Sequence, residues 1–306
     1  MLRYLAGKGF RSVLTVFAVL LITFVAARIS GNPFQFLYDD GLTQEEQAAL
    51  DQEFGLDRPW PAQFVSYLGQ IARGNFGRSI AQRRPVVHLY AEAIGPTLRL
   101  AALSFLATVA IGLPLGLTAA LARHSALGVA AMGVAFVGYA VPHFLLAIIL
   151  ILIFSFYLNW LPSIGSETWW HFIMPTITLS AGLIAAIARY LRGEMLGVLS
   201  QDFVRTARAK GLPESMVIGK HAVRNALIPV ITVLGLKFNG LVSGSLIVET
   251  VFSFQGVGQI FIGSVQLRDY PVLQFGVIAF ALTVVVVNFL VDALYAVVDP
   301  RVRRSG

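Results

Sequence analysis

Long apolar runs alternate with short polar stretches along this chain of 306 residues. Each run covers about 20 residues, the length that an α-helix needs to cross roughly 30 Å of hydrocarbon. A membrane β-barrel would show short alternating strands instead. The pattern therefore predicts an all-α integral membrane protein with six transmembrane helices, at about residues 12–30, 97–122, 127–156, 171–191, 226–250 and 272–297.

The composition agrees with a membrane location. The chain is 57% hydrophobic and only 13% charged, which excludes an ordinary soluble globular protein. It contains no cysteine, so a disulfide framework and a thiolate metal site are excluded. The five histidines lie far apart in the sequence, and we expect no metal site.

The basic residues predict the orientation in the membrane. An even number of spans places both termini on one side, and Lys and Arg favour the cytoplasmic ends of spans. We therefore expect both termini in the cytoplasm and residues 31–94 outside. The residues behind this prediction are Arg3, Lys8, Arg11, Arg123, Arg189, Arg192, Arg205, Arg208, Lys210, Lys220, Arg224, Arg301, Arg303 and Arg304.

The first apolar run has an alternative interpretation as a cleavable signal peptide. A basic start, an apolar run and the small residues Val25-Ala26-Ala27 fit that pattern. Cleavage would leave five spans with the termini on opposite sides.

The polar region after the first run predicts a small helical cap outside the membrane. Thr43 and Glu46 have the spacing of a capping box, which predicts a short helix through about residue 54. Pro59 and Pro61 interrupt the chain before an amphipathic stretch at 62–73. A connecting loop without a docking role remains an equal alternative for this region.

A basic element at 202–224 lies between the fourth and fifth runs. Helical periodicity over 202–210 places Phe203, Val204 and Ala207 on one side, with charged residues opposite. Gly211 provides a left-handed residue that ends this helix, and a second helix begins near Glu214. The residues alone leave three interpretations open: a basic loop at the cytosolic leaflet, a membrane-surface helix, or a docking helix for a soluble partner.

Other functional classes receive little support. Gly219-Lys220-His221 lacks the spacing and the hydroxyl residue of a phosphate-binding Walker A loop. A membrane enzyme would need a reactive constellation such as Gly-x-Ser-x-Gly or His-Glu-x-x-His, and the chain has neither. An ion-coupled secondary transporter tends to show inverted repeats, which are not evident here.

Several segments occur in a fixed order along nearly the whole chain. One is Thr206-Ala207-Arg208-Ala209-Lys210-Gly211 followed by Asn225-Ala226-Leu227-Ile228-Pro229. The others are 55–59 (GLDRP), 74–79 (GNFGRS), 161–162 (LP) with Gly165, 248–254 (VETVFSF), 268–272 (RDYPV) and 299–301 (DPR). Together these segments resemble the permease subunits of ABC importers, in the dipeptide, oligopeptide and nickel branch, and the one that begins at Thr206 resembles their cytoplasmic signature loop.

The resemblance implies a division of labour between subunits. Its expected partners are a second homologous permease, two cytosolic ATPases that bind ATP and Mg, an extracytoplasmic solute-binding protein and membrane lipid, with no nucleic acid. This chain itself would be no enzyme and would hold no cofactor. It would lie in a bacterial or archaeal cytoplasmic membrane, with residues 1–30 as tail and first span, 31–96 as the cap and 97–306 as the permease core.

The resemblance also implies that the loop at 193–225 carries a coupling helix that sits in a groove of an ATPase. Phe203 and Ala207 would be the packing residues, the basic side chains would lie at the rim, and Gly211 would permit the turn. The residues expected in this coupling site are Phe203, Arg205, Thr206, Ala207, Arg208, Ala209, Lys210 and Gly211.

The fifth run is less apolar than the others, and we expect Lys237, Asn239 and Ser243 to line the translocation path. Lys237 departs from the uncharged residue usual in the family, and Gln255 departs from a usual proline. A charge near the bilayer centre costs about 2.5–3.5 kcal/mol on insertion scales, so Lys237 should face protein or a water-filled cavity. Asp292 is a possible ion-pair partner, and small residues in this run can instead serve helix packing.

Other polar residues in the runs have more ordinary expected roles. His143, Arg189 and Asn288 are expected to be structural, whereas Arg28, Arg99 and Glu249 lie near span ends and can extend toward the interface. The solute remains open: peptides are the first expectation, and nickel, glutathione-like molecules and glycosides are the alternatives within the branch.

Overall fold

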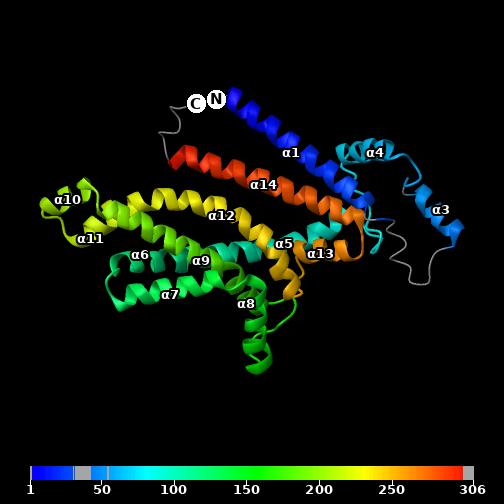
Figure 1. Ribbon diagram of the computed structural model, residues 1–306. Coiled ribbons are helices and arrows are strands. Elements are labelled where there is room, and N and C mark those ends of the chain that lie inside the picture. Colours follow the sequence, from blue (N-terminus) through cyan, green and yellow to red (C-terminus); the bar gives the residue numbers. More distant parts are fainter. Residues whose placement is uncertain (1, 30, 32–42, 54, 299–306) are drawn as a thin grey trace. The chain divides into compact units, whose positions relative to one another are not determined.

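The computed structural model describes residues 2–29, 31, 43–53 and 55–298, and these residues form helices joined by turns (Figure 1). Within those ranges the only strand-like pairing is an isolated bridge between Arg78 and Pro85. The predicted all-helical fold is therefore confirmed. The start of the predicted cap at 32–42 and the basic C-terminal end at 299–306 lie outside the described residues.

The chain divides into two compact units, which are described separately. Unit 1 contains Met1–Gly95 and Gln255–Val285, and unit 2 contains Pro96–Phe254 and Val286–Gly306. Two helices pass from one unit into the other, α5 (Val86–Ala107) and α14 (Tyr270–Val298). Each unit is thus assembled from segments that are far apart in the sequence.

Unit 1 contains α1 (Leu2–Ile29), α3 (Gln44–Glu53), α4 (Trp60–Ala72) and α13 (Val257–Gln266), with the first parts of α5 and α14. The predicted capping box starts α3: the Glu46 amide donates to Thr43 Oγ1 and the Thr43 amide donates to Glu46 Oε2. Helix α4 packs on α1 through Phe64, whose ring centroid lies 5.2 Å from that of Phe24.

A buried carboxylate fixes the turn before α5 to the start of α14. Asp269 is 3% exposed and accepts hydrogen bonds from the Ser79 hydroxyl and from the backbone amides of Ile80 and Ala81. These three donors compensate for the loss of water around the charge. The apolar core of the unit lies beside this turn and consists of Val86, Leu89, Tyr90, Ala93, Val257 and Val272.

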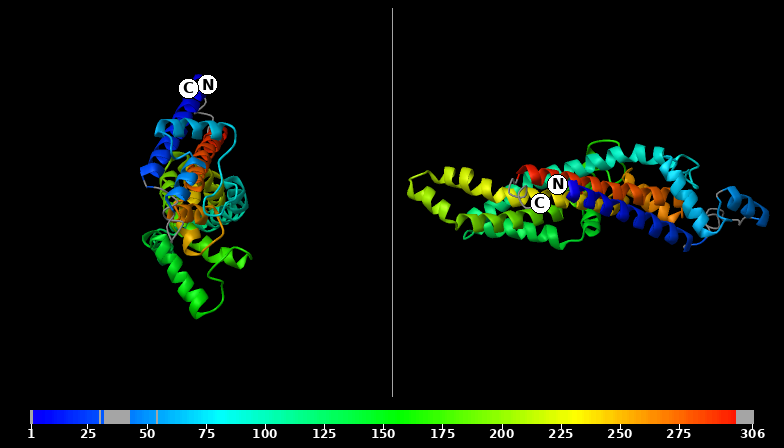
Figure 2. Two further views of the ribbon diagram at one scale, coloured as in Figure 1. Left: turned by 90° about the vertical axis from the view of Figure 1, so that its right-hand side faces the viewer. Right: turned by 90° about the horizontal axis from the view of Figure 1, so that it is seen from above.

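Unit 2 is built around α9 (Trp170–Leu199), which packs against α6 (Leu113–Leu121), α7 (Ala126–Ala140) and α12 (Arg224–Val251). Figures 1 and 2 show α6, α7 and α9 running side by side. Glycine permits a close approach of α6 to α9: a Cβ at Gly116 would lie 2.6 Å from the carbonyl oxygen of Ala188. The helices therefore pack through small residues, as is common in membrane proteins.

The third apolar run is not one continuous helix, contrary to the uninterrupted run expected at 127–156. Helix α7 and the segment of α8 (His143–Leu150) with the π-helical residues Ile151–Tyr157 are bent by 102°. Pro142 causes the break because it has no N–H to donate and disfavours helical dihedrals at Val141, which is extended (φ −86°, ψ 121°).

Each of the six predicted runs lies mainly in helix, with the third divided at Val141 and Pro142, and several of these helices are longer than the runs. Four helical segments among the described residues are long and apolar enough to cross a membrane: Val86–Leu121, Trp170–Leu199, Glu214–Phe238 and Tyr270–Val287. The bent pair would make a fifth, and Val13–Ile29 is a shorter apolar helix. Six crossings therefore remain a prediction from the sequence.

Glu249 was expected to extend toward the interface, and this expectation is wrong. The side chain is fully buried in unit 2 and accepts a hydrogen bond from the Thr97 hydroxyl at 2.9 Å. The sequence places Glu249 near the end of an apolar run, but it does not reveal that this side chain lies on the packed face of α12. Arg28 is half-buried in unit 1 and donates to Gln63, whereas Arg99 is exposed.

Candidate functional site

The element predicted at 202–224 is a helix, a sharp turn and a second helix. Helix α10 (Asp202–Ala209) is followed by α11 (Glu214–Met216), which continues through the π-helical residues Val217–Val223 into α12. Val204 and Ala207 are 0% and 6% exposed and pack against Val217 within the same unit. The loop is thus a folded element held by its own apolar cluster.

Gly211 closes α10 in the left-handed conformation, with φ +78°, as the sequence predicted. Its amide donates to the Arg208 carbonyl at 2.9 Å, and the Leu212 amide donates to the Ala207 carbonyl at 3.4 Å. This is the Schellman arrangement that ends many helices. A Cβ at Gly211 would meet no other atom within 4 Å, so the requirement for glycine is conformational and not steric.

The charged side chains of α10 differ in what they contact. The Arg208 guanidinium makes two hydrogen bonds with the Glu214 carboxylate, Nε to Oε2 at 3.1 Å and Nη2 to Oε1 at 2.6 Å. Arg205 has a longer contact with Asp202 at 3.5 Å. Arg208 therefore joins the two helices across the turn, while Arg205 and Lys210 project from an exposed surface.

Phe203 lies at the edge of the apolar face of α10. Val204 and Ala207 occupy the buried centre of that face, whereas Phe203 remains 42% exposed. Ala207 was expected to pack against a partner, yet it already packs inside this chain. Thr206, whose hydroxyl donates to the Asp202 carbonyl, and Ala209 are exposed.

A second feature of unit 2 is a cavity of about 380 Å³ at the middle of α12. Lys237 and Gly240 from α12 line it, together with Tyr139, His143 and Gly182 from the neighbouring helices. His143 Nδ1 lies 3.0 Å from the Thr178 carbonyl oxygen, which orients the ring. Lys237 thus lies at a cavity, as the cost of a charge in hydrocarbon requires.

The cavity also contains residues that the sequence did not single out. Tyr139 is contacted by Arg189, whose guanidinium carbon lies 4.1 Å from the ring centroid. Gly182 faces the His143 ring, since a Cβ there would lie 3.1 Å from His143 Cε1. The break at Pro142 is the signal that could have pointed to this region, because a broken helix leaves space beside its neighbours.

Part of the predicted path lies outside the described side chains. Nothing is described for the side chains of Asn239, Ser243, Asn288 and Asp292, so the proposed Lys237–Asp292 ion pair stays a prediction. In the part of the chain that is described, no group of three or more His, Asp or Glu residues could hold a metal ion.

The helical fold, the apolar spans and the charged cavity define an integral membrane transport protein. Residues 112–304 match the family described as binding-protein-dependent transport system inner membrane component, and the chain belongs to this family. It is 39% identical over 305 residues to the glutathione transport system permease protein GsiC of Salmonella typhimurium (strain LT2), with 99% of each chain covered. Identity to the GsiC protein of Escherichia coli (strain K12) is 38% over 304 residues, again with 99% of each chain covered.

Solved structures show the same fold. One chain of the MetNI methionine ABC transporter in an inward-facing conformation matches with a TM-score of 0.61 and 19% identity, covering 70% of this chain and 98% of that chain. An amino acid ABC transporter crystallised with histidines matches with a TM-score of 0.53 and 20% identity, covering 69% and 94%. The protein is therefore a permease subunit of a binding-protein-dependent ABC importer.

Proposed function

We propose that this chain forms half of the translocation path for peptide-class solutes, including glutathione-like molecules, and transmits ATP-driven motion through α10. It pairs with a second homologous permease, two cytosolic ATPases and an extracytoplasmic binding protein. ATP and Mg bind to the ATPases, and this chain holds no cofactor. It lies in the cytoplasmic membrane with both termini inside, as the distribution of Lys and Arg supports.

The observation that carries the coupling role is the exposed Phe203 on α10, a helix whose apolar side chains Val204 and Ala207 are packed internally. A helix that docks in a groove needs an apolar anchor and a charged rim, and Phe203 with Arg205 and Lys210 meets both requirements. Val204 and Ala207 act on the other side, where they attach α10 to Val217. An ATPase that moves α10 would thereby move the helix leading into α12.

The charge of the cavity supports a solute with a carboxylate. Lys237 would repel a free divalent metal ion and attract a carboxylate. One histidine, His143, is too few for a nickel site of ordinary ligand number. We therefore assign the path to peptide-like solutes, with Lys237 as the contact for their negative charge and Asn239 and Ser243 as further path residues.

The experiment compares two adjacent residues of α10 in the reconstituted importer. Phe203→Ala removes an exposed side chain and is expected to weaken ATPase binding by about 1–2 kcal/mol, which is about tenfold. Val204→Ala, the matched control, opens a cavity inside the loop and is expected to destabilise the permease itself. ATPase retention, uptake of a labelled tripeptide and the unfolding temperature are measured for both.

Phe203→Ala should leave the unfolding temperature of the permease unchanged while uptake falls. If it retains both ATPases and transports at the wild-type rate, α10 does not dock through this face. If the coupled complex transports no tripeptide in its wild-type form, the assignment of the solute class is wrong.

A further inference from the structure

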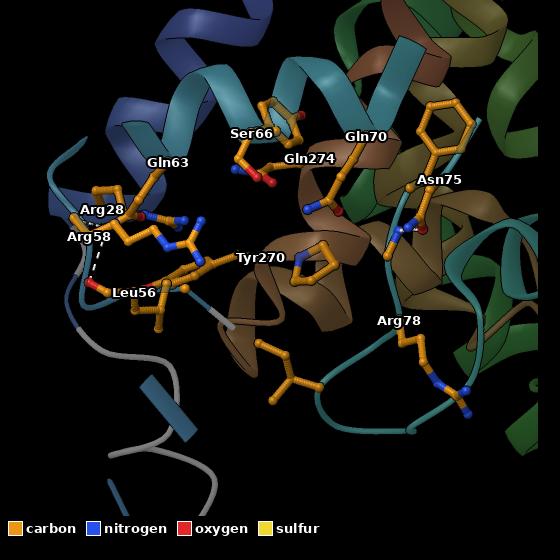
Figure 3. Close-up of a pocket in the computed structure, with 16 residues that line it drawn as sticks. Arg28, Leu56, Arg58, Gln63, Ser66, Gln70, Asn75, Arg78, Tyr270 and Gln274 are labelled. Carbon is orange, nitrogen blue, oxygen red and sulfur yellow. Dashed lines mark hydrogen bonds between the residues drawn. The ribbon is translucent and has the colours of Figure 1, made fainter. Parts of the chain in front are cut away.

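Unit 1 contains a cavity of about 330 Å³ that none of the roles above uses. It lies where the end of α1, helix α4 with the turn that follows it, and the start of α14 come together (Figure 3). Three of the segments that carry the family resemblance contribute to its lining, namely 55–59, 74–79 and 268–272. Its volume is in the range of pockets that hold small molecules.

The lining carries positive charge without a compensating carboxylate. Arg28, Arg58 and Arg78 belong to it, and no Asp or Glu is among the lining residues, all of which lie in the described ranges. Arg78 Nη2 already donates a hydrogen bond to the Arg83 carbonyl at 2.7 Å. Figure 3 shows Arg28 and Arg58 near each other on one side of the pocket. The pocket is therefore suited to an anion.

Arg28 is the most strongly positioned of these cations. Its Nε donates to Gln63 Oε1 at 2.6 Å, and its guanidinium carbon lies 4.7 Å from the centroid of the Phe24 ring. Gln63 is itself fixed, since its Nε2 donates to the carbonyl oxygens of Leu56 and Arg58. Among the described residues, no carboxylate forms an ion pair with Arg28. The two terminal nitrogens of the guanidinium remain available to a bidentate acceptor.

Two neutral donors in the lining also lack an acceptor. The Tyr67 hydroxyl and Gln274 Nε2 are buried without a hydrogen-bond partner, and Gln274 is only 8% exposed. Burial raises the pKa of Tyr67, so the hydroxyl stays protonated and can donate. Buried donors without partners are rare in folded proteins because leaving them unpaired is costly. A bound acceptor would remove that cost.

We propose that this pocket is a second solute site that binds a free carboxylate of a small peptide-like molecule. The planar carboxylate pairs with the terminal nitrogens of Arg28, and Tyr67 and Gln274 donate to the same anion. Leu56, Phe76 and Pro271 supply apolar surface for the rest of the solute. The solute class rests on the proposed function, and the orientation predicted from the basic residues places this pocket on the side where the binding protein delivers solute.

The test uses the assembled importer without its binding protein, in nanodiscs of zwitterionic phosphatidylcholine. Calorimetry measures binding of trialanine with a free C-terminus and of trialanine amide. We expect the amide to bind at least tenfold more weakly. The Lys237→Gln background removes the cation of the other cavity, and the tenfold preference should persist there.

Two variants assign the binding to this pocket. In the Lys237→Gln background, which lacks the cation of the other cavity, Arg28→Gln should abolish detectable binding of trialanine. Gln274→Leu should weaken it several-fold while the unfolding temperature is unchanged or raised, because the variant removes an unpaired buried donor. If Gln274→Leu raises the unfolding temperature and leaves the affinity for trialanine unchanged, Gln274 Nε2 is an unpaired buried donor that binds no solute, and the proposal is wrong.

Three further outcomes would overturn the proposal. Equal binding of trialanine and its amide would show that no carboxylate is recognised. A loss of trialanine binding in phosphatidylglycerol nanodiscs, with lipid retention that depends on Arg28, would identify a lipid phosphate as the occupant. If the complete importer takes up trialanine but Arg28→Gln changes neither binding nor uptake, this inference fails while the proposed function stands.

Discussion

Gly211→Val is the most direct test of whether α10 transmits motion. Gly211 has φ +78°, a region that a β-branched residue strongly disfavours. A Cβ would meet no atom within 4 Å, so the substitution acts on the backbone conformation alone. The membrane helices are unchanged, and we expect the variant to insert and to pair with the second permease.

The size of the effect follows from the geometry of the turn. A left-handed non-glycine residue costs about 1–2 kcal/mol. Relieving the strain would break the hydrogen bonds from Gly211 to Arg208 and from Leu212 to Ala207, each with a net value of about 1 kcal/mol. In both cases the turn with its two hydrogen bonds intact, here called closed, becomes about 1–2 kcal/mol less stable than conformations that lack them, here called open. The ratio of closed to open molecules then falls about tenfold.

Gly211→Asn is the matched control, because asparagine tolerates the left-handed conformation and the site has room for its side chain. Both variants are reconstituted with their partners, and ATPase stimulation by the loaded binding protein, solute uptake and subunit stoichiometry are measured. Because uptake follows the fraction of importers with a closed turn, we expect Gly211→Val to lose uptake, by at most about tenfold, and Gly211→Asn to stay near wild type. Equal uptake by the two variants at full stoichiometry would refute the link between the turn and coupling.

Two other predictions concern the path and the topology. The Lys237→Leu and Lys237→Gln variants should assemble normally but take up carboxylate-bearing solutes at least tenfold more slowly than the wild type. A low yield of the assembled complex for Lys237→Leu alone, restored by Asp292→Asn, would instead indicate a buried ion pair. Single cysteines placed at Gln47, Ser125 and Ser215 of this cysteine-free chain should react with an impermeant thiol reagent in intact cells only at Gln47, and labelling at Ser215 would contradict the orientation.

The sequence predicted the helices well because the apolar runs are long and the helix signals are local. The capping box at Thr43 and the left-handed Gly211 depend on neighbouring residues only, and both are present in the structure. The break at Pro142 was missed because the apolar run continues across it, and hydropathy does not register a missing backbone donor. The presence of the helices could thus be predicted from the sequence, whereas the bend between α7 and α8 could not.

The sites were less predictable because they depend on what covers each face. Helical periodicity grouped Ala207 with Phe203, and only the packing of Val217 shows that Ala207 is internal while Phe203 is exposed. Likewise, the unit 1 pocket is formed by residues from distant parts of the sequence. Arg28 and Gln274, for example, are 246 positions apart (274 − 28 = 246). No local pattern connects residues at that separation.

The position of Lys237 connects the loop at 202–224 with the cavity. Val217, which α10 contacts, and Lys237 lie on one continuous helical segment, about 30 Å apart at 1.5 Å per residue. A rigid segment would carry a displacement of α10 directly to the cavity. Pro229 lies between them and removes one helical hydrogen bond, so bending should concentrate there. Under the proposed coupling role, ATP binding shifts the cavity only if the ATPase contacts α10 differently in its two states, and the exposed face of α10 is where we expect that difference to act.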